Sequence, residues 1–148
     1  RASDNACRSP PFEKSMNRVN FHHFGLAFKN FRHAIRFYEN LGYDIPEAIF
    51  DPLQDVELIL CTSPGQPAVE LVKPVGDHSP VTNFLNKNNE MIYHTCYELE
   101  DIEKDIDILF QNNRAICVSK PKPAILFDNR PVAFYYLNNV GLVEVLQK

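Results

Sequence analysis

The chain has 148 residues, of which 45% are hydrophobic and 23% charged, and its formal net charge is -4. These values are typical of a single soluble domain with a sizeable core, and the lack of basic excess argues against a nucleic-acid partner. No apolar run approaches the roughly 18 residues of a membrane span, and residues 1–16 lack the apolar centre of a secretory signal. We therefore expect a cytoplasmic protein that does not contact membranes.

Residues 1–16 contain Ser, Pro and mixed charges without periodicity, which predicts a flexible extension or residues that precede the native start. One domain is expected over residues 17–148. Its first patterned segment, 21–29, alternates like a strand, with Phe24 facing a helix, His23 facing a cavity and His22 reaching solvent. A helix capped by Asn30 follows, and then apolar runs from Val56 and Ala68.

The second half repeats the first. With His94 placed under His23, residues 23–45 and 94–116 match without gaps in physical type, and Asp101 takes the capping place of Asn30. Apolar runs from positions 114, 132 and 142 complete the second copy. Each copy is predicted to be a βαβββ module, over about residues 19–86 and 90–148, with a polar linker at 85–90. A half of this size cannot enclose a core, so we expect the modules to pair.

The repeat also aligns four polar residues that fall in apolar strands. His94 matches His23, and Glu144 matches Glu70 after three residues of loop slippage. A buried carboxylate without a partner costs several kcal/mol or becomes neutral, so the economical explanation is that all four bind one divalent cation. Imidazole and carboxylate ligands suit Co, Mn, Zn, Ni or Fe. Taken singly, each histidine could be a core residue and each glutamate could face solvent.

The four cysteines show no C-x-x-C spacing, and three of them fall in apolar strands. This pattern favours reduced, small core residues over a zinc knuckle or a disulfide framework.

At these positions the chain resembles the vicinal oxygen chelate superfamily, which includes glyoxalase I, bleomycin-resistance proteins and extradiol dioxygenases. The segments "HHFGLAFKNFRHAIRFYENLGY", "VELVKPVGDHSPVTNFLNKN", "IYHTCYELEDI" and "RPVAFYYLNNVGLVEVLQ" are most similar to the methylmalonyl-CoA epimerases of that superfamily. The resemblance implies an α+β fold in which paired βαβββ modules form a U-shaped, mostly antiparallel sheet around a metal site. It also implies the ligands His23, Glu70, His94 and Glu144, and a homodimer.

The implied function is a metal-dependent epimerase or isomerase that removes a proton α to a carbonyl of a small molecule, possibly an acyl-CoA. Glu144 is the first candidate for the base and Glu57 the second. The alternatives are a glyoxalase I-like lyase and a non-catalytic protein that binds a small molecule such as an antibiotic. An extradiol dioxygenase fits less well, because it would use two histidines and only one carboxylate.

The chain departs from the epimerase pattern at one position. A glutamate that moves the α-proton in that family corresponds here to Leu53, which cannot carry a proton. Strand alternation would place Asp55 and Glu57 on the side of Leu53, so either could substitute, although the pattern favours solvated surface carboxylates for both.

Overall fold

A computed structural model describes residues 18–111 and 113–148, so the predicted extension at 1–16 and Cys7 lie outside the described residues. The first half of the chain contains β1 (Val19–Ala27), α1 (Arg32–Asn40), β2 (Ile49–Asp51), β3 (Val56–Cys61) and β4 (Ala68–Pro74). Helix α2 (Pro80–Lys87) leads to the second half. That half contains β5 (Met91–Leu99), α3 (Ile102–Phe110), β6 (Ala115–Ala124), a 3-10 turn η1 (Ile125–Phe127), β7 (Arg130–Leu137) and β8 (Gly141–Gln147). Both predicted βαβββ modules are therefore present.

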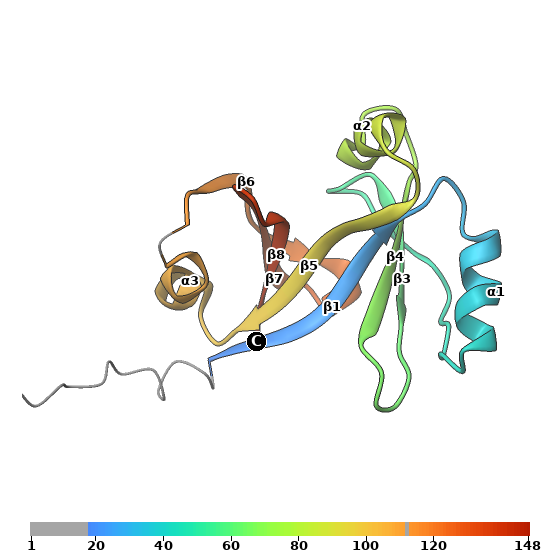
Figure 1. The fold of residues 1–148 in the computed structure, drawn as a ribbon, viewed down its shortest axis with the longest axis horizontal. Coiled ribbons are helices and arrows are strands. Elements are labelled where there is room, and N and C mark those ends of the chain that lie inside the picture. Colours follow the sequence, from blue (N-terminus) through green and yellow to red (C-terminus); the bar gives the residue numbers. More distant parts are fainter. Residues whose placement is uncertain (1–17, 112) are drawn as a thin grey trace, which may run out of the picture.

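The strands form one curled sheet in the order β2-β3-β4-β1-β5-β8-β7-β6. The two modules meet where β1 pairs with β5 in antiparallel orientation. Within each module the first strand pairs in parallel with the last, β1 with β4 and β5 with β8, and the other neighbours are antiparallel. Figure 1 shows β1 and β5 crossing the centre of the molecule side by side, with α1 and α3 on opposite sides of it. The structure confirms the predicted mostly antiparallel, half-barrel architecture.

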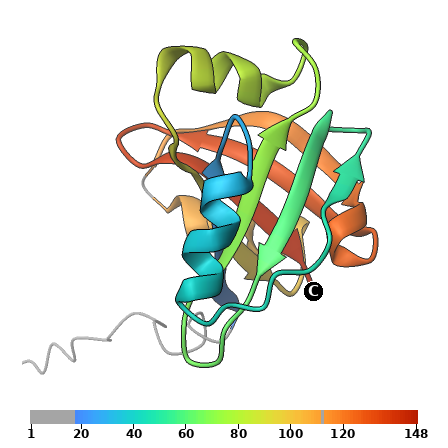
Figure 2. The same ribbon diagram turned by 90° about the vertical axis from the view of Figure 1, so that its right-hand side faces the viewer.

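Each module covers the outer face of its half of the sheet with its own helix. Phe31 and Ala34 of the α1 region pack against Ile59 and Leu71, which are buried, and α1 lies in front of β3 and β4 in Figure 2. In the second module Ile102 at the start of α3 belongs to an equivalent buried cluster. Burying apolar side chains on one face of each helix stabilises the sheet and leaves its concave side for other groups.

The capping residue at the start of α3 is the predicted one, and that of α1 lies one residue later than predicted. Asp101 caps α3 by accepting a hydrogen bond from the Lys104 backbone N–H. The cap position of α1 is Phe31, one residue later than predicted, while the Asn30 side chain accepts from the backbone N–H of Arg32 at 3.3 Å.

Two other expectations are corrected. The first half of the predicted linker at 85–90 is helical, because α2 starts with Ser79 as its cap and Pro80 in its first turn and runs to Lys87. Cys61 and Cys96 are buried as predicted, but Cys117 is exposed because β6 is an edge strand of the sheet. Among the described residues, no helix has the length and hydropathy needed to cross a membrane.

Candidate metal centre and adjoining cavity

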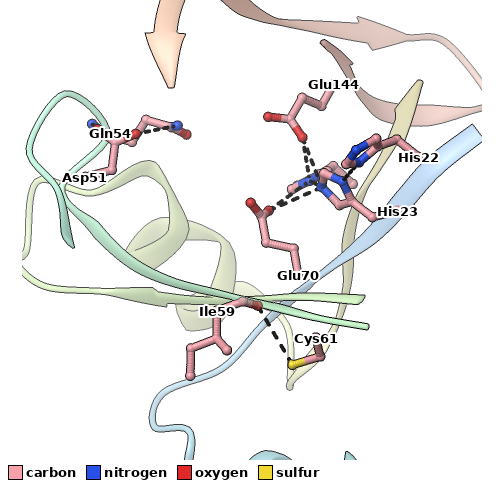
Figure 3. Close-up of polar contacts among 9 residues, drawn as sticks. His22, His23, Asp51, Gln54, Ile59, Cys61, Glu70 and Glu144 are labelled. Carbon is pink, nitrogen blue, oxygen red and sulfur yellow. Dashed lines mark hydrogen bonds and ion pairs between the residues drawn. The ribbon is translucent and has the colours of Figure 1, made fainter. Parts of the chain in front are cut away.

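Four side chains from the two modules meet on the concave side of the sheet, and we call them the cluster: His23, Glu70, His94 and Glu144. Each is at most 3% exposed, and their ligand atoms all lie within 4.8 Å of one another. The Nε2 atom of His94 lies 3.1 Å from Glu144 Oε2 and 3.2 Å from Glu70 Oε2. The Nε2 atom of His23 lies 3.1 Å and 3.5 Å from the same two oxygens and 3.2 Å from His94 Nε2. In Figure 3, Glu70 and Glu144 point toward His23 from opposite sides.

Gly25 makes room for one half of the cluster. It pairs with Glu70 on β4 and with His94 on β5, so the three residues form a row across the sheet. A Cβ atom on residue 25 would lie 2.1 Å from Cε1 of His94, far inside contact distance. The His94 ring therefore occupies the place that any other residue at position 25 would fill with its side chain.

The other half of the cluster is built by an equivalent row. Cys96 on β5 pairs with His23 on β1 and with Glu144 on β8. The offset of 71 positions that relates His23 to His94 also relates Gly25 to Cys96, so each imidazole stands beside a small residue of the opposite module. The internal repeat thus explains how two short rows place all four side chains around one point.

The cluster balances two carboxylates with two imidazoles. Burial acts to lower the pKa of His94, but Glu144 and Glu70 outweigh it and raise this pKa to about 10. The same opposition of burial and carboxylates raises the pKa of His23 to about 8. Burial opposes ionisation of Glu144, yet the neighbouring imidazoles hold its pKa well below the usual range. Protons on the two imidazoles offset the carboxylate charge, and a divalent cation could replace them.

The separations also fit a cation. Two nitrogen or oxygen ligands about 2.1 Å from one metal ion lie about 3.0–3.4 Å apart when they are neighbours in an octahedral or tetrahedral shell. The five distances given above run from 3.1 to 3.5 Å. In addition, Glu144 Oε2 faces both imidazoles without a well-directed hydrogen bond. The residues present therefore suit a divalent ion held by nitrogen and oxygen ligands.

His22 does not lie where strand alternation predicts. Phe21 pairs with Tyr97 and His23 with the next residue, Cys96, so His22 is the extra residue of a β-bulge. The bulge turns the His22 ring to the side of His23, where the two Nδ1 atoms are 2.7 Å apart (Figure 3). The prediction that His22 lies on the opposite face from His23 is wrong, because the inserted residue breaks the period-two pattern, although His22 is partly exposed as expected.

A cavity of about 360 Å³ adjoins the cluster. Tyr93 and Phe134 line it, and both rings also contact the His94 ring, with centroids 5.5 Å away in each case. The volume lies within the range of small-molecule sites, roughly 300–1,000 Å³. Its wall is largely apolar, and Asp55, His78 and Lys122 contribute charged or titratable groups. Burial, followed by the charges of Glu144 and Glu70, raises the pKa of Tyr93 to about 12, so its phenol stays protonated near neutral pH.

The segment around Leu53 is a turn rather than a strand. Residues 52–55 connect β2 to β3, and Leu53, Gln54 and Asp55 all line the cavity. Asp51 shapes this turn, since its Oδ1 accepts from the backbone N–H of Leu53 at 2.8 Å. The strand alternation assumed for Leu53, Asp55 and Glu57 is therefore wrong.

Asp55 and Glu57 consequently differ in their surroundings. Asp55 is one of the residues that line the cavity. Glu57 lies on β3 opposite Lys73 of β4, and the two side chains form an ion pair. The structure brings Glu144 into the cluster but leaves Glu57 outside it, and a catalytic role for either residue remains a prediction.

The sequence analysis did not single out Tyr93 or His78 as residues of the site. Tyr93 lies in a strand, and His78 lies in a loop without a periodic pattern. The position of Tyr93 directly before His94 was the one available signal. Neighbouring residues of a strand usually face opposite sides of the sheet, so strand alternation gave no reason to place Tyr93 beside the His94 ring.

Comparison with known proteins places the chain in a family. A family model described as the glyoxalase/bleomycin resistance protein/dioxygenase superfamily matches residues 22–134. Methylmalonyl-CoA epimerase of Dictyostelium discoideum is 33% identical over 85% of this chain and 76% of the relative. Ethylmalonyl-CoA/methylmalonyl-CoA epimerase of Cereibacter sphaeroides is 32% identical over 84% of this chain and 95% of the relative.

Solved structures show the same fold. Methylmalonyl-CoA epimerase from Mycobacterium tuberculosis superimposes with a TM-score of 0.71 at 19% identity, covering 86% of each chain. A hypothetical protein from Bacillus halodurans gives a TM-score of 0.75 at 24% identity, covering 88% of this chain and 94% of the other. The chain therefore belongs to the glyoxalase/bleomycin resistance protein/dioxygenase superfamily, an assignment that the paired modules, the buried cluster and the sequence matches all support.

Proposed function

We propose that this protein is a metal-dependent epimerase that inverts a carbon α to the thioester carbonyl of an acyl-CoA. The observation that carries the proposal is the buried cluster of two imidazoles and two carboxylates beside a cavity. Two relatives that are 33% and 32% identical to this chain are named as epimerases of methylmalonyl-CoA and of ethylmalonyl-CoA/methylmalonyl-CoA. A carbon flanked by a thioester and a carboxylate bears an acidic hydrogen, which is the chemistry such a site can use.

The four cluster residues would hold the ion, and their donor set suits Mn²⁺, Fe²⁺, Co²⁺, Ni²⁺ or Zn²⁺. When bound, a divalent ion supplies Lewis-acid stabilisation of negative charge on a carbonyl oxygen, which makes the neighbouring C–H more acidic. The apolar cavity wall, which includes Phe134 and Leu142, would exclude water from the reacting carbon.

Glu144 is the proposed base. Its Oε2 atom is the one that contacts both imidazoles, and its pKa lies far below the usual range because those imidazoles oppose the effect of burial. A carboxylate with a low pKa is a weak base, so it can accept the α-proton only when that proton has been acidified. The base must therefore lie next to the divalent ion that acidifies the proton, and Glu144, as a member of the cluster, would do so.

Inversion also requires a group that delivers a proton to the opposite face of the carbon. Leu53 lines the cavity at the position that corresponds to the proton-transferring glutamate of the methylmalonyl-CoA epimerases, and its aliphatic side chain cannot carry a proton. Asp55 lines the cavity, whereas Glu57 of β3, the second candidate from the sequence, is paired with Lys73 of β4. We therefore favour Asp55 over Glu57 for the second proton transfer.

One experiment separates the two proton transfers. Protein loaded with Co²⁺ is incubated with a single epimer of methylmalonyl-CoA in D₂O, and both deuterium uptake and formation of the other epimer are followed. Epimerisation accompanied by uptake is expected, and Glu144→Gln should abolish both. A wild-type protein that binds the ion but exchanges no α-proton would contradict the proposal.

Two variants refine the assignment of the second group. Asp55→Asn should reduce epimerisation by about 10²-fold or more while uptake of deuterium continues, since one face can still exchange with the solvent through Glu144. Leu53→Glu should restore epimerisation in the Asp55→Asn background if position 53 can carry the proton. Glu57→Gln is the matched control and should change neither reaction.

A homodimer is the second part of the proposal. Ile116, Val118 and Tyr136 expose apolar surface on the edge strand β6 and its neighbour β7, and Ile116 lies directly opposite Tyr136. Exposed apolar patches of this kind often mark protein–protein contacts. Light scattering coupled to size-exclusion chromatography should give twice the chain mass, and Ile116→Lys should shift it to the mass of one chain.

A further inference from the structure

We propose that His22 is a positioning residue that accepts a hydrogen bond from His23 Nδ1–H and thereby keeps the lone pair of His23 Nε2 directed at the cluster. The inference deepens the proposed function and rests on the same metal centre. It concerns a neighbour of the ligands rather than a ligand, and it starts from the bulge in β1.

The geometry of the two rings is that of a hydrogen bond. The Nδ1 atoms of His22 and His23 are 2.7 Å apart, which is hydrogen-bond distance, so one ring must donate and the other accept. A neutral imidazole carries its proton on only one nitrogen. For His23 to offer Nε2 to a cation, its proton must stay on Nδ1, and His22 Nδ1 must therefore be the acceptor.

The surroundings of His22 favour that role. Phe127 fixes the arrangement, because its ring stacks on His23 at 5.6 Å and meets the His22 ring edge-on at 5.4 Å. The guanidinium of Arg130 lies over the Phe127 ring, 5.9 Å from its centroid, and is itself paired with Glu98.

The bulge is what makes this contact available. In a regular strand His22 would point to the opposite face of the sheet, and the buried Nδ1–H of His23 would need another partner. Ligand histidines commonly donate their second N–H to a carboxylate or a carbonyl, and loss of that partner typically weakens metal binding 10–100-fold. Here the neighbouring residue in the chain supplies the acceptor.

A second metal site is the competing explanation for the same residues. Ligand atoms of His22, His23 and Cys96 also lie within 4.8 Å of one another. However, two nitrogens bound about 2.0–2.1 Å from one tetrahedral ion would be about 3.3–3.4 Å apart, which is longer than the 2.7 Å between these two. The hydrogen bond accounts for the short distance and a shared ion does not.

Three variants test the inference through metal affinity. The probe is Zn²⁺, and its affinity for the 148-residue chain is measured by competition with a chelator. His22→Phe keeps a ring against Phe127 but has no acceptor, and it should bind Zn²⁺ about 10–100-fold more weakly. His22→Asn places its Oδ1 where the imidazole has Nδ1, so affinity should stay within about threefold of wild type. His33→Phe, on the exposed face of α1, is the control and should match wild type.

A spectroscopic readout separates positioning from packing. In ¹⁵N-histidine-labelled, zinc-loaded protein, NMR should show His23 protonated at Nδ1 in wild type and in His22→Asn. If His22→Phe fails to fold, His22→Gln takes its place in the test. The side-chain oxygen of Gln lies one bond further from the backbone than that of Asn, so it should not replace the acceptor, and Zn²⁺ binding should be weak. Equal Zn²⁺ affinity in wild type and His22→Phe would overturn the inference, and so would equally weak binding by His22→Asn.

The stoichiometry completes the test. One Zn²⁺ per chain is expected, and two would favour the shared-ion explanation and overturn ours. A wild-type chain that binds no Zn²⁺ would refute the metal centre itself, whereas normal wild-type binding with unaffected His22→Phe would refute only the role of His22.

Discussion

The charge balance of the cluster predicts that metal affinity depends steeply on pH. In the metal-free protein the pKa of His23 is about 8 and that of His94 about 10, so both imidazoles carry a second proton near neutral pH. A metal ion can bind only after these protons leave the Nε2 atoms, whereas the carboxylates are already ionised.

The expected slope follows from these values. From pH 6 to pH 7 nearly two protons are released for each ion bound, so affinity should rise about 100-fold. From pH 8.5 to pH 9.5 His23 is mostly deprotonated already, about one proton is released, and the rise should be about tenfold.

Isothermal titration with Co²⁺ in buffers of different ionisation enthalpy measures the released protons directly. Chelator competition across the pH series gives the affinities, after correction for the pH dependence of the chelator. A pH-independent affinity between pH 6 and pH 7 would refute the reasoning, because it would mean that the imidazoles are neutral before the ion binds.

Three other predictions concern metal affinity and the stability of the fold. Gly25→Ala should weaken metal binding about tenfold or more by displacing His94, whereas the control Gly65→Ala, which strains a turn at φ +73°, should lower the melting temperature without affecting the metal. In the metal-free protein the raised pKa values of His23 and His94 stabilise the fold fully below about pH 6.5, and this stabilisation is lost as pH rises through about 8 and 10. The melting temperature of the metal-free protein should therefore fall over that pH range, and bound Zn²⁺ should prevent the fall. Asp51→Ala should lower the urea-derived free energy of unfolding by about 1–3 kcal/mol, since Leu53 N–H and the Gln54 side chain lose their acceptor, and metal affinity should not change.

The sequence predicted the cluster because the cluster lies on strands. Strand residues are constrained by alternation and pairing, and the internal repeat supplied a second copy of each constraint. His23 and His94 occupy equivalent places, and so do Glu70 and Glu144, so two ambiguous histidines and two ambiguous glutamates became one consistent set. The same repeat predicted the pairing of the two modules.

Two of the features that escaped prediction depend on contacts between distant segments, and the third, the turn at 52–55, depends on a single side chain next to it. The bulge at His22 exists only in relation to the pairing partner of β1, and no local pattern in residues 19–27 reveals it. The turn at 52–55 depends on the side chain of Asp51, which is buried and accepts from backbone N–H groups two and three residues later. Exposure of Cys117 follows from the edge position of β6, which is a property of the whole sheet.

The same contrast distinguishes the cluster, which would bind a metal ion, from the cavity, which would select the substrate. The cluster is symmetric, because each module supplies one histidine and one glutamate from equivalent strands. The cavity is not symmetric: the 52–55 turn contributes Leu53 and Asp55 from the first module, while Lys122 and Phe134 come from β6 and β7 of the second. A substrate held at the cluster therefore meets different groups on its two faces. We therefore expect substitutions in that turn and in β6 to change which substrate is bound without disturbing the proposed metal ligands.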